Sequence, residues 1–372
     1  MPRFPVEAIE LRIARLPLVA PFRTSFGKEA ERLTVIVSAA SGSRSGWGES
    51  PVARLPGYCY ETAGTAFHIL ADVLAPRVAG LEIGGPEDLA GLWKGLKGHP
   101  LARAGLEAAV WDLKARFEGK PLRDLFGGTR DRIEVGVSVG IQDSIPALLR
   151  SIEAYLAQGY RRVKIKIEPG WDVDVAKAVR KRFPDLRLWA DANQAYRRED
   201  LERLKGLREA NLELLEQPLH EDDLLGHAEW QERLGIPICL DESVGSETGL
   251  ENAIALRALS VLNVKPARVG GNLAAIRIAQ RCASAGIPVW CGGLLETGIG
   301  RAHNVAVASR PEFTMPGDLS ASNRYFEKDV VRPPFELGPG GTLAVPGGVG
   351  LGVGVDLDFL DSATIRKAIV RV

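Results

Sequence analysis

The spacing of hydrophobic residues changes once within the first third of the chain. Residues 8–16 and 33–40 contain the short apolar runs of β-strands, and the Gly- and Ser-rich stretch 41–46 predicts a hairpin turn. From residue 61 to 126 the apolar positions have helical spacing, most clearly over 101–117, where they recur every three or four residues. We therefore expect an α+β unit with an antiparallel sheet.

Beyond residue 132, short apolar stretches alternate with amphipathic stretches of helical length. Seven strands are expected, at residues 133–139, 162–167, 186–191, 212–216, 236–241, 261–265 and 287–291. Helices are expected between them, for example at residues 173–182, 222–234 and 273–285. Such βα units build a parallel sheet, and seven of them with a short eighth strand near 313–318 predict a closed barrel. A doubly wound sheet is the alternative, because periodicity alone does not show closure.

Composition narrows the class of partner. The 372 residues, 45% hydrophobic and 25% charged, are enough for a sizeable core and for about two domains. The 47 basic residues balance 47 acidic ones, so no net field attracts nucleic acid or an anionic membrane. A small-molecule partner is expected.

The cysteines and the N-terminal residues bear on the compartment. The four cysteines form no CxxC pair, and a chain of this size needs no disulfide, which fits a reducing environment. Charged residues interrupt the apolar stretch after Met1, and no run of 18 apolar residues follows. We expect neither a signal peptide nor a spanning helix, and a cytoplasmic location.

Charged side chains recur at the C-terminal ends of five successive predicted strands. They are Lys166 (with Lys164), Asp191, Glu216, Asp241 and Lys265. The intervals between them are 25, 25, 25 and 24 residues, which is the length of one βα unit. Barrel enzymes carry their reacting groups on this rim. One such charge alone fits a solvated strand end equally well, but five in phase predict an active site.

The order of these charges indicates the chemistry. Asp191, Glu216 and Asp241 form an all-oxygen set that suits a hard cation, Mg²⁺ above all, with Mn²⁺ or Co²⁺ as substitutes. A lysine beside such a cation has a lowered pKa and can act as a base, which fits Lys166 and Lys265. The cation would bind a substrate carboxylate and stabilise the enediolate formed when the α-proton leaves. The chemistry predicted is proton transfer alpha to a carboxylate.

The same residues resemble the muconate-lactonizing subgroup of the enolase superfamily, for which lysine bases and Mg²⁺ are typical. Within it the chain is most similar to o-succinylbenzoate synthases that often also act as N-succinylamino acid (N-acylamino acid) racemases. Besides Lys164-Ile-Lys166, the three carboxylates and Lys265, the supporting stretches are residues 21–27, 136–142, 159–166, 169–172, 264–271, 290–303 and 316–318. The resemblance covers essentially the whole chain.

This resemblance implies a domain organisation. An α+β capping domain (residues 1–130) would cover a (β/α)7β barrel, a modified TIM barrel (131–320), and a C-terminal segment (321–372) would pack back on the cap. Loops at residues 19–26 and 53–58 would close on the barrel mouth and set specificity. By analogy with other capped barrels, a homo-oligomer, a dimer or an octamer, is expected.

The resemblance also implies roles for single residues. Lys166 would remove the α-proton, and Lys164 would orient and tune Lys166. Lys265, on the opposite face, would be the second acid–base group in racemisation or would stabilise charge in dehydration. Further contacts to the substrate or to these residues are implied for Ser138, Asn193, Glu242, Gly292, Gly293, Phe22, Arg23 and Tyr58. Arg268 looks like the arginine of the racemase branch, and the alternative is a surface arginine paired with a carboxylate.

Two departures from the family pattern concern the pocket. Arg23 stands where many relatives have an acid, and Gln194 follows Asn193 where serine is commoner. Substrate preference is therefore expected to differ from that of other members.

Several alternatives stay open or are disfavoured. A muconate-type cycloisomerase would use every catalytic residue named above, and a dipeptide epimerase would need an Asp-x-Asp where the chain has Asp318-Leu-Ser320. A histidine base is not expected, because Cys291-Gly-Gly stands at the seventh strand end, and no histidine pair predicts zinc. An alternative from another class is a catalytically inactive binding or scaffold protein on this fold. A third is an unrelated metal-dependent barrel lyase whose acids lie on the rim by chance.

Overall fold

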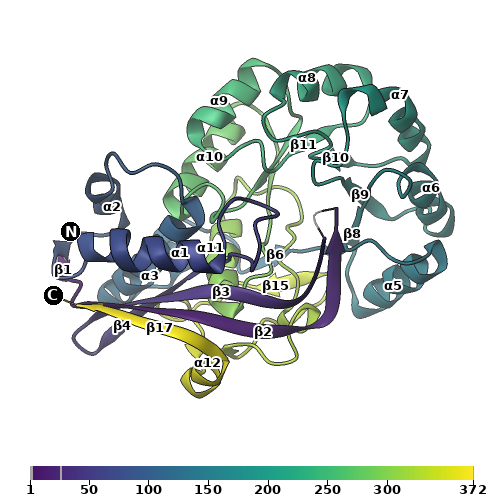
Figure 1. The fold of residues 1–372 in the computed structure, drawn as a ribbon. Helices are drawn as coiled ribbons and strands as arrows, with labels where there is room; N and C mark the ends of the chain where they lie inside the picture. Colours follow the sequence, from purple (N-terminus) through teal and green to yellow (C-terminus); the bar gives the residue numbers. More distant parts are fainter. Residues whose placement is uncertain (1–2, 26, 372) are drawn as a thin grey trace.

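The N-terminal strands form one antiparallel sheet, to which the end of the chain adds a strand. The computed structural model describes residues 3–25 and 27–371. The sheet contains, in spatial order, β17 (Thr364–Arg371), β2 (Ala8–Thr24), β3 (Gly27–Ser41) and β4 (Arg44–Ser50) (Figure 1). The hairpin predicted at residues 41–46 is the turn between β3 and β4. The domain boundaries after residues 130 and 320 stay a prediction.

Strands β2 and β3 extend beyond their predicted ends to the mouth of the barrel (Figure 1). The sequence predicts a loop at residues 19–26, but most of it belongs to β2, because the ladder continues through the pair Arg23 and Lys28. Phe26 lies outside the described residues. The second predicted loop, residues 53–58, contains no helix or strand.

The segment between the N-terminal sheet and the barrel forms helices, the longest of which packs on the sheet. They are α1 (Ala63–Ile69), α2 (Pro86–Leu92), α3 (Pro100–Glu118) and α4 (Leu122–Phe126). The predicted helix at 101–117 is confirmed as α3, which is buried along most of its length because it packs on β4 on one side and on the barrel helix α10 (Asn272–Ser284) on the other. A Cβ at Gly48 would lie 2.2 Å from the Gly105 carbonyl oxygen, so this approach requires glycine.

Seven parallel strands with helices outside them form the second unit (Figure 1). The strands are β7 (Val137–Val139), β8 (Arg162–Lys166), β9 (Arg187–Asp191), β10 (Leu214–Glu216), β11 (Ile238–Leu240), β12 (Val261–Val264) and β13 (Val289–Cys291). The helices are α5 (Ile145–Gln158), α6 (Val173–Arg182), α7 (Leu201–Leu204), α8 (Leu224–Arg233), α9 (Glu247–Ala255), α10 and α11 (Gly298–Ala308). The strands pair in chain order without reversal. A doubly wound sheet reverses its order, so that alternative is wrong and the predicted barrel class is confirmed.

The first and last strand predictions need correction. The stretch 133–139 is not one strand: β6 (Arg132–Glu134) pairs with β15 (Thr342–Ala344) of the tail, and only β7 joins the barrel. The break falls at Gly136, where the Arg162 guanidinium fills the space of a side chain. No strand forms at 313–318, but single bridges join this segment to β13 and to Val135, which closes the ring.

The C-terminal residues return to the capping unit. A short pair of strands, β14 (Val331–Arg332) and β16 (Gly354–Val355), is followed by α12 (Leu357–Ala363) and by β17, which lies beside β2. The tail therefore connects the barrel to the edge of the N-terminal sheet.

Candidate active site

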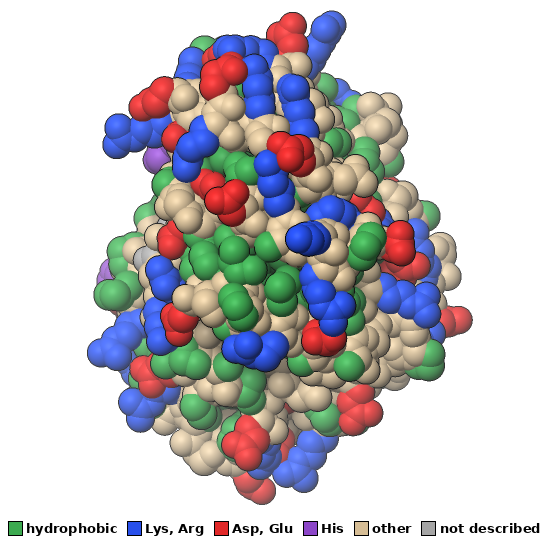
Figure 2. Space-filling model, turned by 90° about the vertical axis from the view of Figure 1, so that its right-hand side faces the viewer, with side chains coloured by type: hydrophobic (Ala, Val, Ile, Leu, Met, Phe, Trp, Pro, Cys, Tyr) green, Lys and Arg blue, Asp and Glu red, His purple; other side chains and the backbone are tan. Residues whose placement is uncertain are grey.

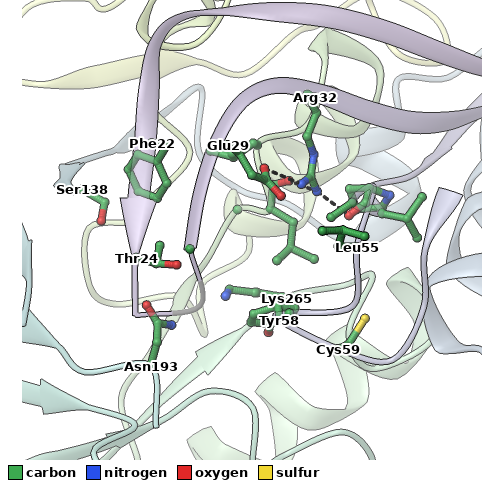
Figure 3. A pocket seen from close by; sticks show the side chains of 18 of the residues that line it. Phe22, Thr24, Glu29, Arg32, Leu55, Tyr58, Cys59, Ser138, Asn193 and Lys265 are labelled. Atoms are coloured by element: carbon green, nitrogen blue, oxygen red, sulfur yellow. Dashed lines mark hydrogen bonds and ion pairs between the residues drawn. The ribbon is translucent and has the colours of Figure 1, made fainter. Parts of the chain in front are cut away.

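A cavity of about 320 Å³ lies between the C-terminal ends of the barrel strands and the capping unit. Its barrel side is polar and includes Lys164, Lys166, Asp191, Asn193 and Lys265. Its other side comes from the β2–β3 hairpin and the 53–58 loop, which contribute Phe22, Thr24, Glu29, Arg32, Leu55 and Tyr58 (Figure 3). Segments far apart in the sequence thus enclose one chamber at the predicted rim.

The three predicted metal ligands lie side by side on neighbouring strands. Asp191 and Glu216 are directly paired across β9 and β10, and Asp241 follows β11. All three side chains are buried. Burial raises the pKa of Glu216, and the charges of Asp191 and Asp241 raise it further. The mutual effect of these carboxylates indicates a site that gains stability from a cation.

Lysine ammonium groups lie among these carboxylates. Lys166 Nζ donates to Asp191 Oδ2 at 2.6 Å and to Asn193 Oδ1 at 2.5 Å. Lys265 Nζ donates to Asp241 Oδ2 at 2.6 Å and lies 4.3 Å from the centre of the Tyr58 ring. The structure therefore brings the two predicted acid–base lysines to the cavity, from strands β8 and β12 on different sides of the ring.

Lys164 has a different environment from the other two lysines. Its Nζ lies 2.5 Å from Glu216, 2.7 Å from Asp318 and 3.0 Å from Asp191. Burial alone lowers the pKa of Lys164, but these three carboxylates outweigh burial and hold the pKa well above its usual value. Lys164 therefore remains a cation and serves as a fixed counter-charge.

The donor chemistry fits a hard divalent cation. The carboxylates of Asp191, Glu216 and Asp241 supply only oxygen, and Glu242 Oε2 beside them is buried without a hydrogen-bond partner. Within residues 3–25 and 27–371, no three acidic, histidine or cysteine side chains are already gathered as a metal-holding group, since ammonium groups take the carboxylate oxygens. A bound ion would replace some of these ammonium groups as the partner of the carboxylate oxygens.

Arg268 is buried, so the alternative of a surface arginine is wrong. Its guanidinium donates to Asp241, to the Asn263 carbonyl oxygen at 2.5 Å and to the Val244 carbonyl oxygen at 3.1 Å. The Tyr58 hydroxyl donates to the same Asp241 carboxylate at 2.8 Å. Burial raises the pKa of Asp241, but Lys265 and Arg268 outweigh it and lower that pKa. Asp241 is therefore held as an anion.

The remaining predicted residues divide into two groups. Ser138 and Gly293 line the cavity, and the Ser138 hydroxyl is buried without a partner. Arg23 instead points to Glu168, 3.2 Å away, and is not among the residues that line the cavity. Gly292 packs on Asn263, whose Oδ1 would lie 2.2 Å from a Cβ at that position.

Sequence reasoning missed several polar residues of the site. Asp318 accepts from Lys164 and pairs with Arg162, and these cations hold the pKa of Asp318 low in spite of its burial. The signal for Asp318 was its place after the last barrel segment, in the same rim position as the other acids. Arg32, which pairs with Glu29 at 3.2 Å, had no such signal because it lies in a strand of the capping sheet.

Known protein families and individual proteins are similar to this chain in sequence. A model of the mandelate racemase/muconate lactonizing enzyme N-terminal domain matches residues 8–127, and an enolase C-terminal domain-like model matches residues 147–359. The chain is 47% identical to an N-succinylamino acid racemase of Thermus thermophilus over 97% of both chains. It is 46% identical to an o-succinylbenzoate synthase of Geobacillus stearothermophilus over 94% of both.

A solved structure extends the comparison to three dimensions. An enolase superfamily member from Listeria innocua superposes with a TM-score of 0.94, at 42% identity and over 99% of both chains. Matches of this extent include both the capping unit and the barrel. The chain therefore belongs to the mandelate racemase/muconate lactonizing enzyme family of the enolase superfamily, among the o-succinylbenzoate synthases and N-succinylamino acid racemases.

Proposed function

We propose that this enzyme is a Mg²⁺-dependent o-succinylbenzoate synthase, a carbon–oxygen lyase of menaquinone biosynthesis, that also racemises N-succinylamino acids. The observation that carries the proposal is that Lys166 and Lys265 line one cavity at the C-terminal ends of β8 and β12, with the three carboxylates at the ends of the strands between them. Both reactions begin with the loss of a proton alpha to a carboxylate, so one pair of lysines serves both.

Asp191, Glu216 and Asp241 are the residues that would hold Mg²⁺, which supplies positive charge to the substrate carboxylate and to the enediolate. Lys166, as the neutral amine, takes the α-proton. In the dehydration the β C–O bond breaks on the same face, and the hydroxyl leaves as water with the proton that Lys166 took. In the racemisation Lys265 donates a proton to the opposite face, and the chirality at the α-carbon inverts.

Other residues of the cavity support these steps. Lys164 keeps its charge between Asp191 and Glu216 and so limits the repulsion among the ligands. The Ser138 hydroxyl has no protein partner and lines the cavity, which suits a hydrogen bond to the bound substrate. Phe22 supplies apolar contact from the hairpin.

One observation argues against the dipeptide epimerase. That reaction needs an Asp-x-Asp at residues 318–320, but Ser320 stands where the second acid would be, and the remaining Asp318 carboxylate already pairs with Arg162 and Lys164. The muconate-type cycloisomerase shares all the catalytic residues, and only an assay with the lactone separates it.

We further propose a cytoplasmic homo-oligomer, a dimer or an octamer, that acts on small carboxylates without nucleic acid or membrane. The face of the molecule in Figure 2 mixes basic and acidic side chains around a central group of hydrophobic ones, with no surface of a single sign. No helix in residues 3–25 and 27–371 is long and apolar enough to span a membrane.

The test is a parallel assay of the purified protein with Mg²⁺ in D₂O. Dehydration of the cyclohexadiene precursor of o-succinylbenzoate and α-proton exchange of N-succinylamino acids are measured side by side. Both activities are expected. Exchange without dehydration would make the enzyme a racemase, and the absence of both would refute the proposal.

A further inference from the structure

The end of the β2–β3 hairpin contacts the backbone of a residue that binds the catalytic base. Ser25 Oγ donates to the Asn193 carbonyl oxygen at 3.0 Å. The two residues are 168 positions apart in the sequence, one in the capping unit and one just after β9. Figure 3 shows Asn193 pointing into the cavity beside Thr24 of the same hairpin end.

The backbone at Asn193 has a conformation that side chains disfavour. Asn193 has φ +41° and Gln194 has φ +65°, two consecutive left-handed residues. Asparagine tolerates this region and glutamine does so less well, so outside contacts must hold the turn. Three such contacts hold the two backbones and the Gln194 side chain. The Gln194 amide donates to the Gln217 carbonyl oxygen at 2.8 Å, Gln194 Oε1 accepts from the Glu221 amide at 2.8 Å, and the Ser25 hydroxyl donates to the Asn193 carbonyl oxygen.

The Asn193 side chain transmits the position of this turn to Lys166. Its Oδ1 accepts from Lys166 Nζ at 2.5 Å, and its Nδ2 donates to Glu242 Oε1 at 3.2 Å. Its backbone amide donates to Asp191 Oδ1 at 3.0 Å. A rotation of the turn would therefore move the oxygen that orients the Lys166 amine.

The hairpin can serve as a support because it is fixed to the barrel by other contacts. The Ile141 amide donates to the Arg23 carbonyl oxygen at 3.0 Å, and Arg23 pairs with Glu168 at 3.2 Å. A Cβ at Gly140 would lie 2.7 Å from the Arg23 carbonyl oxygen, so the hairpin backbone lies directly on the barrel there. Ser25 extends from this anchored strand end.

We infer that Ser25 is a positioning residue for Lys166: its hydroxyl holds the Asn193 turn, and Asn193 in turn orients the amine that takes the α-proton. This inference rests on the role proposed for Lys166. It assigns to the capping unit a part in the proton transfer itself, beyond enclosing the substrate. Loss of the hydroxyl should slow the proton transfer and leave substrate binding nearly unchanged.

The experiment compares Ser25→Ala with Ser25→Thr, which keeps a hydroxyl. Ser284→Ala is the matched control, because Ser284 Oγ also donates to a carbonyl oxygen, that of Gln280, at 3.0 Å, but at the exposed end of α10. Expected for Ser25→Ala is a fall in kcat of about tenfold, the equivalent of one hydrogen bond, with KM changed less than about twofold. The isotope effect with α-deuterated N-succinylamino acid should rise.

Ser25→Thr should recover most of kcat, and Ser284→Ala should match the wild type. Backbone amide exchange over residues 191–196 should be faster in Ser25→Ala alone. A raised KM with unchanged kcat, a threonine variant no better than alanine, or unchanged amide exchange would overturn the inference. If the wild type neither exchanged the α-proton nor dehydrated its substrate, the proposed function would fail, and amide exchange would still decide whether Ser25 holds the turn.

Discussion

Each carboxylate of the predicted metal site has an ammonium or guanidinium partner. Glu216 accepts from Lys164 Nζ at 2.5 Å and from Asn263 Nδ2 at 2.7 Å, and Asp241 accepts from Lys265, Arg268 and Tyr58. The protein thus surrounds its own acids with donors that a divalent cation would partly replace. When a cation replaces these donors, the lysine amines lose their contacts to the carboxylates, so metal binding and the release of the amines are linked.

Replacement of one ligand tests this arrangement. Glu216→Gln should lower Mg²⁺ affinity at least about tenfold, because the amide keeps the shape but loses the charge that the ion binds. The readout is the rise in Tm on addition of Mg²⁺, which should be much smaller than for the wild type.

Glu213→Gln is the control for this substitution. Glu213 precedes β10, and its carboxylate binds Arg187 and the Trp189 indole instead of the cavity lysines. A Glu216→Gln variant with the full Mg²⁺-dependent rise in Tm would show that Glu216 is not a ligand.

At the scale of elements, the capping unit places buried side chains on the ends of two barrel helices. Glu107 of α3 accepts from the amides of Asn272 and Leu273 at the start of α10, and burial raises its pKa to about 7. Glu49 of β4 accepts from the amide of Gly300 in the first turn of α11. Such contacts satisfy amides that have no partner within their own helix.

A histidine completes the same interface and makes it sensitive to pH. His303 of α11 donates from Nε2 to the Trp47 carbonyl oxygen of β4 at 2.9 Å, and burial lowers its pKa to about 4. Between about pH 6.5 and pH 4 the unfolded chain binds a proton that the folded protein does not. The stability that His303 contributes is therefore complete above pH 6.5 and is lost as the pH falls toward 4.

The variant His303→Gln should remove this dependence. From pH 7 to pH 5 it should lose about 2 kcal/mol less unfolding free energy than the wild type, because its amide does not titrate. Urea unfolding at the two pH values gives the difference, and His68→Gln, at an exposed histidine, is the control. Equal losses in His303→Gln and the wild type would contradict the expectation.

Prediction from sequence worked where the signal was local and failed where it came from a distant partner. Periodicity located α6 at Val173–Arg182, and the 25-residue interval located the rim acids. The break at Gly136 depends on Arg162, and the hydrogen bond between Ser25 and Asn193, for which the sequence gives no signal, joins residues 168 positions apart. Both partners are too far away in the sequence for the spacing of neighbouring hydrophobic residues to reveal them.

At the scale of the whole molecule, one cavity joins both units. The barrel supplies the charges and the capping unit supplies the opposite wall, so neither unit contains the site alone. Within the barrel, three strands separate β8 from β12, and this places Lys166 and Lys265 on different sides of the cavity. We propose that each lysine acts on one face of the α-carbon.

The most direct test is α-proton exchange in D₂O with each enantiomer of an N-succinylamino acid, in Lys166→Ala and Lys265→Ala. Lys265→Ala should exchange one enantiomer without racemising it, and Lys166→Ala should lose that exchange and the dehydration by about 10³-fold or more. Lys177→Ala, a lysine outside the cavity that pairs with Glu209, should retain all activities. Racemisation that survives in either cavity variant would contradict the two-lysine account.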